Sequence, residues 1–307
     1  MCGGRMRISL EQWQALVAVV EQGGYARAAD HLNKTQSTIS YAVRQIEERL
    51  GVGVFEVQGR KAQLTEAGQV LYRRGKSLVN ESARLERAAG NLAQGREKEL
   101  RLAVESLFPT DLLLRCLQRF ADESPETRIE LFESVVGGTD ELLLGGHVDL
   151  AIFADGVPQG YTGDVLLRYR ALAVAAPSHP LHQLQRDLSV EDLRAHRHLV
   201  IRDSGQQRQR ASVWNVAEQR LTVSHKSTSV RAACMGLGFA WYVEDWIRDE
   251  LESGQLLPLP MIAGAERWGS LYLVYPDPDG AGPGARRLGA LLKEAAAQER
   301  GTDFQAP

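Results

Sequence analysis

The sequence predicts an α/β chain made of a small helical head, a long helix and a layered body. Three observations predict this fold class. Leucines recur every seven residues at Leu71, Leu78, Leu85 and Leu92, the spacing at which one face of a long helix meets a partner helix. Three short helical patterns precede that repeat, and strand-like runs alternate with helical runs after it. We therefore expect a head over 8–65, a linker helix over 66–95 and a body over 99–307.

Charge is distributed unevenly along the chain. Residues 1–98 carry 15 Lys and Arg against 10 Asp and Glu, whereas the remaining residues carry 21 against 29. A basic head on an acidic body suits a polyanionic partner at one end only. No run approaches the roughly 18 apolar residues of a membrane span, and no export signal precedes Met6. We expect a cytoplasmic protein without a membrane partner, whose translation starts at Met1 or at Met6.

The three cysteines, Cys2, Cys116 and Cys234, are odd in number and widely spaced. This usage indicates a reducing compartment and excludes a disulfide framework. Cys116 and Cys234 lie in apolar helical runs, where a small buried residue is the simpler interpretation. Redox sensing by that pair is the alternative, and it requires an accessible, electropositive environment.

The head begins with two helices. Ser9 is the predicted N-cap of a first helix that runs to about Gln22, because apolar residues follow it at helical spacing. Gly23 and Gly24 end that helix. A short second helix is predicted from Tyr25 to Leu32, with Ala28 and Ala29 small enough for another helix to cross closely.

A third helix is predicted from Gln36 to Leu50, after a turn at Asn33–Thr35. At 100° per residue its aliphatic residues fall within an arc of about 60°, and its hydroxyl, phenol and guanidinium groups fall about 140° away. The aliphatic arc, predicted to be core, consists of Ile39, Val43, Ile46 and Leu50. The polar arc, with Gln36 beside it, suits base edges and phosphates in a major groove; a solvated face is the alternative. This arc consists of Ser37, Ser40, Tyr41 and Arg44.

A wing follows the third helix. Val52–Phe55 and Gln63–Thr65 flank the glycine-centred turn Gln58–Lys61, which predicts two short extended segments. Arg60 and Lys61 lie at the tip, where they would contact phosphates; a solvated basic turn is the alternative.

These residues resemble the LysR-type transcriptional regulators. The resemblance rests on order, spacing and identities over about sixty residues. It is carried by Gly24-Tyr25-x-x-Ala28-Ala29-x-x-Leu32, Thr35-Gln36-Ser37-Thr38-Ile39-Ser40-Tyr41-Ala42-Val43-Arg44-Gln45-Ile46-Glu47, Leu50-Gly51-x-x-x-Phe55 and Leu64-Thr65-x-Ala67-Gly68. The chain departs from the family at Val57, where an Arg is usual, so Arg60 or Lys61 would replace that phosphate contact.

The resemblance implies a winged helix-turn-helix that binds a double-stranded DNA operator. The residues that we predict to contact DNA lie on the second helix, on the third helix with its preceding turn, and on the wing. They are Tyr25, Arg27, Thr35, Gln36, Ser37, Thr38, Ser40, Tyr41, Arg44, Arg60 and Lys61.

The long helix is predicted from Glu66 to about Gln94, a stretch that contains no proline. Small residues between its leucines, which are Gly75, Ser82 and Ala89, would let two copies approach closely. The alternative is a helix that packs on its own domain. The pattern predicts self-association, and the resemblance implies antiparallel pairing in a dimer and often a tetramer.

The body is predicted to be an α/β structure with largely parallel sheets. Strands are expected at 100–104, 127–132, 148–153, 172–175, 199–201, 221–223 and 239–243, and helices at 109–121, 139–144, 230–236, 244–252 and 285–298. Two lobes are expected. The first covers about 99–167 and 270–299, the second about 168–269, with crossings near Leu167–Tyr169 and Arg267–Ser270.

An effector would bind beyond the carboxyl ends of strands, where helix N-termini present free N–H groups. Ser106 follows the first strand, and Arg202-Asp203-Ser204 follows a later one. Their hydroxyl and guanidinium groups suit a polar or acidic effector, although a serine before a helix is also an ordinary N-cap. The residues predicted to contact the effector are Ser106, Phe108, Thr110, Phe153, Arg202, Asp203, Ser204 and Trp268.

The body also resembles the LysR-type family, through Val148-Asp-Leu-Ala-Ile, His179-Pro180-Leu181 and the run from Val230 to Ala240. The resemblance implies a two-lobed, periplasmic-binding-protein-like effector domain. Trp241 and Tyr242 depart from the Leu-Pro pair of many relatives.

Enzyme and metal signatures are weak. His179 and His182 are spaced HxxH, and His196 and His198 are spaced HxH, but neither pair has a third ligand nearby in sequence. No GxSxG, HExxH or P-loop motif is present. We expect no catalytic residue, metal or cofactor. The competing hypothesis is a small-molecule binding protein or enzyme whose head mediates protein contacts.

The prediction is therefore a DNA-binding transcriptional regulator that is not an enzyme. Its expected partners are an operator, a small-molecule effector of unknown identity and further copies of itself, with RNA polymerase as a candidate.

Overall fold

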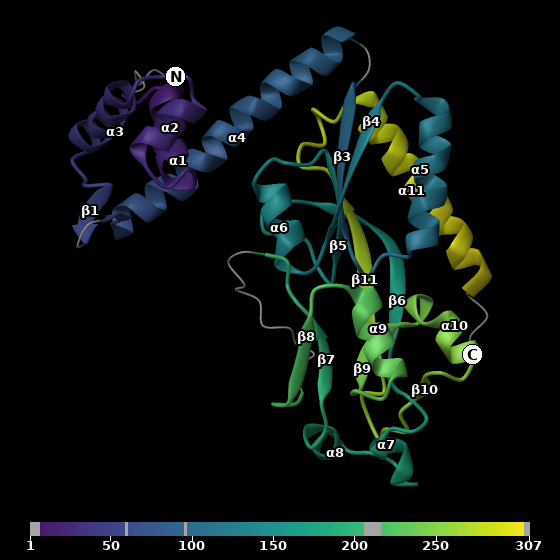
Figure 1. Ribbon diagram of the computed structural model, residues 1–307. Coiled ribbons are helices and arrows are strands. Elements are labelled where there is room, and N and C mark those ends of the chain that lie inside the picture. The colour runs from purple at the N-terminus through teal and green to yellow at the C-terminus, as the bar shows by residue number, and fades with distance from the viewer. Residues whose placement is uncertain (1–6, 59–60, 95–96, 206–215, 304–307) are drawn as a thin grey trace. The chain divides into compact units, whose positions relative to one another are not determined.

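The computed structural model describes residues 7–58, 61–94, 97–205 and 216–303 (Figure 1). The chain divides into two compact units, Met1–Gly90 and Asn91–Pro307. Each unit has its own hydrophobic core. The division between Gly90 and Asn91 falls inside the long helix Glu66–Gln94. The predicted boundaries of the domains and lobes stay predictions.

The first helix of the head, α1 (Leu10–Glu21), begins with a capping box at Ser9. The Ser9 hydroxyl accepts from the Gln12 N–H at 3.3 Å, and the Gln12 side chain accepts from the Ser9 N–H at 2.8 Å. This reciprocal pair satisfies two backbone donors that the helix cannot satisfy itself. The predicted start of the first helix is confirmed.

The second and third helices are α2 (Tyr25–His31) and α3 (Gln36–Leu50), within one residue of their predicted bounds. Ala28 and Ala29 are buried where the helices cross. Gly51 ends α3 at φ 69°, a left-handed conformation that glycine adopts without strain. The wing is formed by β1 (Phe55–Gln58) and β2 (Lys61–Leu64), which pair antiparallel.

The long helix α4 (Glu66–Gln94) has 29 residues, as predicted. Leu71 packs against the head core, and a Cβ at Gly75 would lie 2.9 Å from the Trp13 ring. Leu78 and Leu85, by contrast, are 47% and 72% exposed. The first part of the leucine seam therefore packs on its own domain, and the next part is exposed. The side chain of Leu92 lies outside the described part of the chain.

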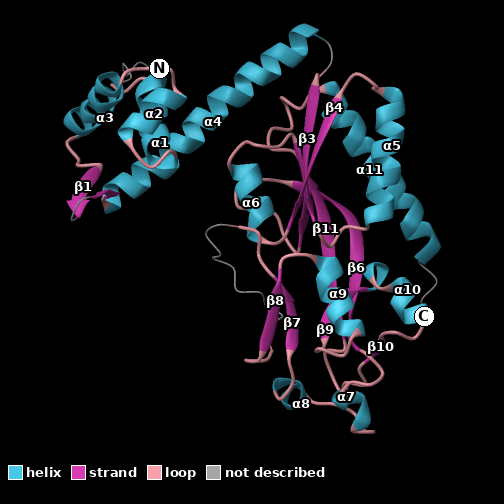
Figure 2. Ribbon diagram, in the orientation of Figure 1, coloured by secondary structure: helices cyan, strands magenta, loops and turns pink. Residues whose placement is uncertain are grey.

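The body contains a seven-stranded sheet in the order β10-β6-β11-β5-β3-β4, with β9 also pairing with β6. Figure 2 shows the strands of the body in magenta among cyan helices. The strands of the sheet are β3 (Glu99–Glu105), β4 (Arg128–Ser134), β5 (Leu150–Ala154), β6 (Gly163–Ala175), β9 (Ala240–Val243), β10 (Leu257–Pro258) and β11 (Glu266–Val274).

The prediction of largely parallel sheets is wrong for this sheet. β3 runs parallel to β4 and β5, but β11 is antiparallel to β5 and β6, and β6 is antiparallel to β9 and β10. The chain leaves the first lobe along β6 and returns along β11. Two neighbouring strands that carry the chain out and back must run in opposite directions.

A separate parallel pair, β7 (His198–Ile201) and β8 (Arg220–Val223), belongs to the second lobe. Helices surround the strands, and α5 and α11 lie side by side (Figure 1). The helices are α5 (Thr110–Glu123), α6 (Gly137–Leu144), α7 (Pro180–Gln183), α8 (Val190–Arg194), α9 (Lys226–Cys234), a 3₁₀ turn (Glu244–Trp246), α10 (Arg248–Glu252) and α11 (Pro283–Asp303). Within the described residues, no helix is both long and apolar enough to cross a bilayer.

Candidate DNA-binding surface and effector cleft

The apolar face of α3 anchors the helix in the head. Ile39, Val43 and Ile46 are at most 1% exposed and lie in the core of the head. Leu50, predicted to join them, is 38% exposed. It lies in the last turn of the helix, beside an apolar groove at the start of α4. The predicted core stripe is therefore correct for its first three members and wrong for the last.

Hydroxyl groups organise the N-terminus of α3. The Thr35 hydroxyl caps the helix by accepting from the Thr38 N–H at 3.2 Å. The same Oγ1 atom lies 2.9 Å from Ser37 Oγ and 2.8 Å from Thr38 Oγ1. Thr35 therefore positions its neighbours at a helix N-terminus whose residues 35–38 are exposed, and the positive end of the helix dipole lies there.

The polar arc of α3 is open to solvent. Gln36, Ser37, Ser40, Tyr41 and Arg44 are all exposed, and the Tyr41 side chain is 55% exposed. None of them packs beneath the described part of the head, so the arc forms a continuous polar surface.

Arg44 is held by two neighbours on its own helix. Its guanidinium lies 5.7 Å from the centre of the Tyr41 ring, and its Nε lies 3.5 Å from a Glu48 carboxylate oxygen. With side chains 64% and 55% exposed, the Arg44–Glu48 pair is weak and readily exchanged for a phosphate. Sequence reasoning missed Glu48 because nothing in the motif separates it from an ordinary surface acid.

Two predicted contacts on α2 have structural partners. Tyr25 is half-buried, its ring centre lies 5.9 Å from that of Phe55 in the wing, and burial raises the pKa of its phenol. Arg27 donates to the Gly23 carbonyl at 2.7 Å while remaining exposed. Tyr25 therefore joins the helices to the wing, and Arg27 lies at the solvent edge of α2.

Glu47 holds the base of the wing, a role that sequence reasoning missed. Its Oε1 accepts from the Val54 N–H at 2.7 Å and from the Phe55 N–H at 3.4 Å. Lys61 begins β2, so its backbone is in the predicted wing, but its side chain and the whole of Arg60 lie outside the described residues.

In the body, predicted effector contacts lie at the strand ends of the first lobe. Ser106 follows β3, and its hydroxyl donates to Glu105 Oε1 at 3.3 Å. Thr110, the first residue of α5, accepts from Lys226 Nζ of α9 at 2.8 Å. This hydrogen bond joins Thr110 of the first lobe to Lys226 of the second lobe.

The segment after β7 contacts the start of α6. The Val135 N–H donates to Ser204 Oγ at 2.9 Å, and the Gly137 N–H donates to Asp203 Oδ1 at 3.0 Å. Arg202 is exposed beside them. The structure thus brings Asp203 and Ser204 to the first lobe, where they hydrogen-bond with backbone amides.

The three predicted aromatic contacts do not form one exposed wall. Phe108 and Phe153 are 2% and 3% exposed and belong to the hydrophobic cores of the body. Trp268 is 67% exposed, with the Arg170 guanidinium 5.8 Å from its ring centre. The expectation that they share the apolar part of a cleft surface is corrected accordingly, because strand alternation and the core direct their side chains differently.

Glu105 is a buried carboxyl group beside the predicted effector contacts, and it was not among the predicted site residues. It ends β3, is 4% exposed, and accepts from the Val136 N–H at 2.8 Å and from the Thr139 hydroxyl at 3.4 Å. Burial raises the pKa of Glu105 to about 7, although its hydrogen bonds oppose that shift. The sequence signal that could have identified Glu105 is its position as a carboxyl group at the end of the apolar strand β3.

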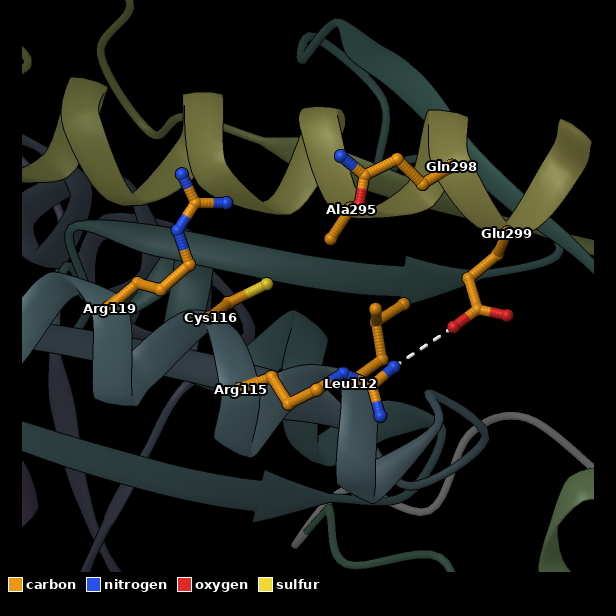
Figure 3. A pocket seen from close by; sticks show the side chains of 7 residues that line it. All are labelled: Leu112, Arg115, Cys116, Arg119, Ala295, Gln298 and Glu299. Carbon is orange, nitrogen blue, oxygen red and sulfur yellow. Dashed lines mark hydrogen bonds and ion pairs between the residues drawn. The ribbon is translucent and has the colours of Figure 1, made fainter.

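A separate hollow of about 270 Å³ lies between α5 and α11 (Figure 3). The thiol of Cys116 points toward it, and an ion pair of 2.9 Å joins Arg115 to Glu299 across it. None of the predicted effector residues lines it. Burial raises the pKa of the Cys116 thiol, which favours the unreactive thiol form.

The histidine pairs pack as structural groups. His179 caps α7 by accepting from the Leu181 N–H at 3.2 Å, and its ring centre lies 5.2 Å from that of His196. His198 stacks on Phe239 at 5.1 Å. Among the described residues, no group of three or more His, Cys, Asp or Glu side chains has an arrangement suited to a metal ion.

Family models match both parts of the chain. The model described as bacterial regulatory helix-turn-helix protein, lysR family, matches residues 10–69, and the LysR substrate binding domain matches residues 93–297. The HTH-type transcriptional regulator YhaJ of Escherichia coli O157:H7 is 29% identical over 256 residues, covering 81% of this chain and 85% of YhaJ. PunR of Escherichia coli strain K12, also an HTH-type transcriptional regulator, is 26% identical over 274 residues, covering 86% and 83%.

Solved structures show the same fold. ArgP from Mycobacterium tuberculosis superposes with a TM-score of 0.62 at 21% identity, covering 93% of this chain and 96% of ArgP. Full-length LysG from Corynebacterium glutamicum, solved with bound effector Arg, gives a TM-score of 0.60 at 20% identity, covering 95% and 99%.

Three observations point to the same family. The head carries an exposed polar helix face, the body has two lobes, and the chain matches both LysR family models. The chain belongs to the LysR family of DNA-binding transcriptional regulators, which are not enzymes, and its body is an effector-binding domain of that family.

Proposed function

We propose that this regulator reads a specific operator through the polar arc of α3. The observation that carries the proposal is the division of this helix: Ile39, Val43 and Ile46 are buried, while every residue of the polar arc is exposed. A helix anchored on one face and polar on the other fits the major groove. The readers are Gln36, Ser37, Ser40, Tyr41 and Arg44.

Flanking groups complete the proposed DNA surface. Thr35 and Thr38 hold the N-terminus of α3, where free N–H groups can bind a phosphate. Tyr25 and Arg27 border it on α2, and Arg60 with Lys61 would anchor the wing to the backbone of the duplex.

We propose that two copies associate through α4. Leu78 and Leu85 form an unpartnered apolar stripe on this helix. An apolar groove of about 470 Å³, lined by Leu50, Val52, Ala67, Val70 and others, lies at its first turns. A second copy packed along α4 would cover both. A dimer of heads predicts a pseudo-palindromic operator, and further association of dimers would give a tetramer.

The proposed effector site lies between the lobes, near Ser106, Thr110 and Arg202–Ser204. An effector that prefers one arrangement of the lobes would shift the population of that arrangement and so reposition the heads. LysG, whose fold this chain shares, was solved with Arg bound.

The remaining partners follow from regulation of transcription. A protein that acts at an operator works where the chromosome lies, so we place it in the cytoplasm. We also propose RNA polymerase as a partner of the operator-bound oligomer.

The test is a salt titration of DNA binding by the full chain and by Arg44→Ala. Duplexes selected from a random-sequence pool by the wild-type chain serve as the specific probe. We expect log K to fall steeply with log salt, and Arg44→Ala to lose ~1–3 kcal/mol of specific binding. Arg194→Ala, which removes an exposed arginine of α8, is the matched control. Full affinity in Arg44→Ala would overturn its role, and the absence of any duplex binding would overturn the proposal.

A further inference from the structure

Three successive backbone amides at the start of α6 each donate to a side-chain oxygen. Val135 donates to Ser204 Oγ at 2.9 Å, Val136 to Glu105 Oε2 at 2.8 Å, and Gly137 to Asp203 Oδ1 at 3.0 Å. The acceptor for Val136 belongs to the first lobe, as α6 does. The acceptors for its two neighbours come from the segment after β7, in the second lobe.

The backbones approach each other closely at this contact. The Ser204 N–H also donates to the Val135 carbonyl at 3.1 Å. A Cβ added at Gly138 would lie 2.0 Å from Ser204 Oγ, and a Cβ added at Gly205 would lie 2.9 Å from the Gly137 carbonyl carbon. A side chain at Gly138 would therefore have to displace the Ser204 side chain, and a side chain at Gly205 would have to displace the Gly137 backbone.

The contact between the start of α6 and the segment after β7 leaves one buried polar atom without a hydrogen bond among the described residues. Asp203 Oδ1 accepts from both Gly137 and Gly205, the latter at 2.8 Å. Asp203 Oδ2 is buried and has no hydrogen-bond partner among the described residues. Val136 adopts φ 52°, a left-handed conformation that is unfavourable for a β-branched residue. An unpaired buried oxygen and a strained turn both lower the stability of the closed contact.

We propose that Asp203 and Ser204 form a clasp that holds the two lobes together in the absence of effector. The inference rests on the proposed effector site between the lobes. An effector must then reach its site by opening the clasp, so its apparent affinity is reduced by the population of closed molecules. The contact thereby links effector entry to the relative arrangement of the lobes.

Amide hydrogen exchange on the full-length chain tests the clasp without effector or DNA. In Asp203→Ala/Ser204→Ala we expect the Val135 and Gly137 amides to exchange at least about tenfold faster than in the wild type. The Val136 amide, bonded within the first lobe to Glu105, should change much less. Arg194→Ala, which truncates an exposed arginine of α8 outside the proposed effector site, is the matched control and should leave all three amides unchanged.

Unchanged exchange at Gly137 in the double variant would overturn the proposal. Equal acceleration at Val136 would also overturn it, because protection would then be lost at an amide bonded within the first lobe, as expected for local unfolding of the N-terminus of α6. Either result leaves the reading of DNA by α3 intact, since the exchange measurement does not involve the head.

A second pair of variants checks the close approach itself. Gly138→Ala places a methyl group against Ser204 Oγ, so we expect faster exchange at Gly137 with an unchanged unfolding midpoint of the head. Adding Ser204→Gly removes the two side-chain atoms nearest to this methyl group, and should restore most of the Gly137 protection. Failure of this rescue would contradict a direct Gly138–Ser204 contact as the cause.

Discussion

The N-termini of α3 and α6 use the same backbone chemistry in opposite ways. In α3, Thr35 caps the helix from the local sequence, and the polar groups beyond it remain exposed. At the start of α6, two of three successive amides donate to Ser204 and Asp203, which lie 69 and 66 residues further along the chain. The α3 surface is therefore formed and open within a single head, whereas two amides at the start of α6 are covered by a distant segment of the chain. If the proposed roles are right, the α3 surface can meet DNA without rearrangement, whereas effector binding at the α6 contact requires a rearrangement.

The largest expected effect comes from a mutation in the buried face of α3, which anchors this helix in the head. Ile46→Ala should lower the free energy of unfolding of the head by ~2–5 kcal/mol, because a fully buried side chain is replaced by a cavity. Calorimetry of the full chain should show a lower transition for the head alone. Leu85→Ala, at a 72% exposed position, is the control, measured below the concentration at which the chain associates. Equal effects in both variants would contradict the assigned core.

Glu105, which accepts a hydrogen bond at the start of α6, should make the stability of the body depend on pH. Its folded-state pKa of about 7 exceeds the ordinary value of 4.5, so the folded state holds the proton more tightly. Stability should therefore fall as pH rises from about 4.5 to about 7, by about 3 kcal/mol. Above that range this contribution is constant.

The measurement is the difference in unfolding free energy between wild type and Glu105→Gln across this pH range. His179 and His198, whose pKa burial lowers to about 4 in each case, titrate in both proteins and cancel in the difference. A difference that stays flat with pH would contradict the assigned environment of Glu105.

Thr35→Ala removes the local cap of α3 and should cost ~0.5–2 kcal/mol of head stability. Because Thr35 also orders Ser37 and Thr38, operator affinity should fall as well. Thr35→Ser, which keeps the hydroxyl, should recover most of both losses in thermal unfolding and DNA titration. Wild-type affinity in Thr35→Ala would show that the hydroxyl cluster has no part in binding.

The smallest expected effect concerns Glu48. Glu48→Gln frees Arg44 from an exposed pair and removes a negative charge near the phosphates. Operator binding should strengthen by a few tenths of a kcal/mol up to ~1 kcal/mol, with the gain shrinking at high salt. Glu11→Gln, whose carboxylate pairs with Lys34 outside α3, controls for net charge. Weaker binding in Glu48→Gln would instead show that Glu48 orients Arg44 productively.

The head could be predicted almost completely because its signals are local. Capping residues, glycines and a 3.6-residue periodicity set the limits of α1, α2 and α3 and the outward direction of the polar arc. Leu50, Leu71 and Gly75 were the exceptions. Whether each of these positions faces solvent, the head or another copy depends on where α4 packs on α1, and the periodicity of one helix carries no such information.

In the body, the sequence by itself determined where most strands and helices lie, but the tertiary structure decided their pairing and what their ends contact. The strand directions depend on β6 and β11 running together as the link between lobes, which no single segment encodes. Phe108 and Phe153 share an apolar signal with surface-lining residues, yet the packing of the sheet buries them. Asp203 and Ser204 meet Val135 and Gly137 only because folding brings the ends of β7 and β4 to one place, and hydrogen bonds form between neighbours in space.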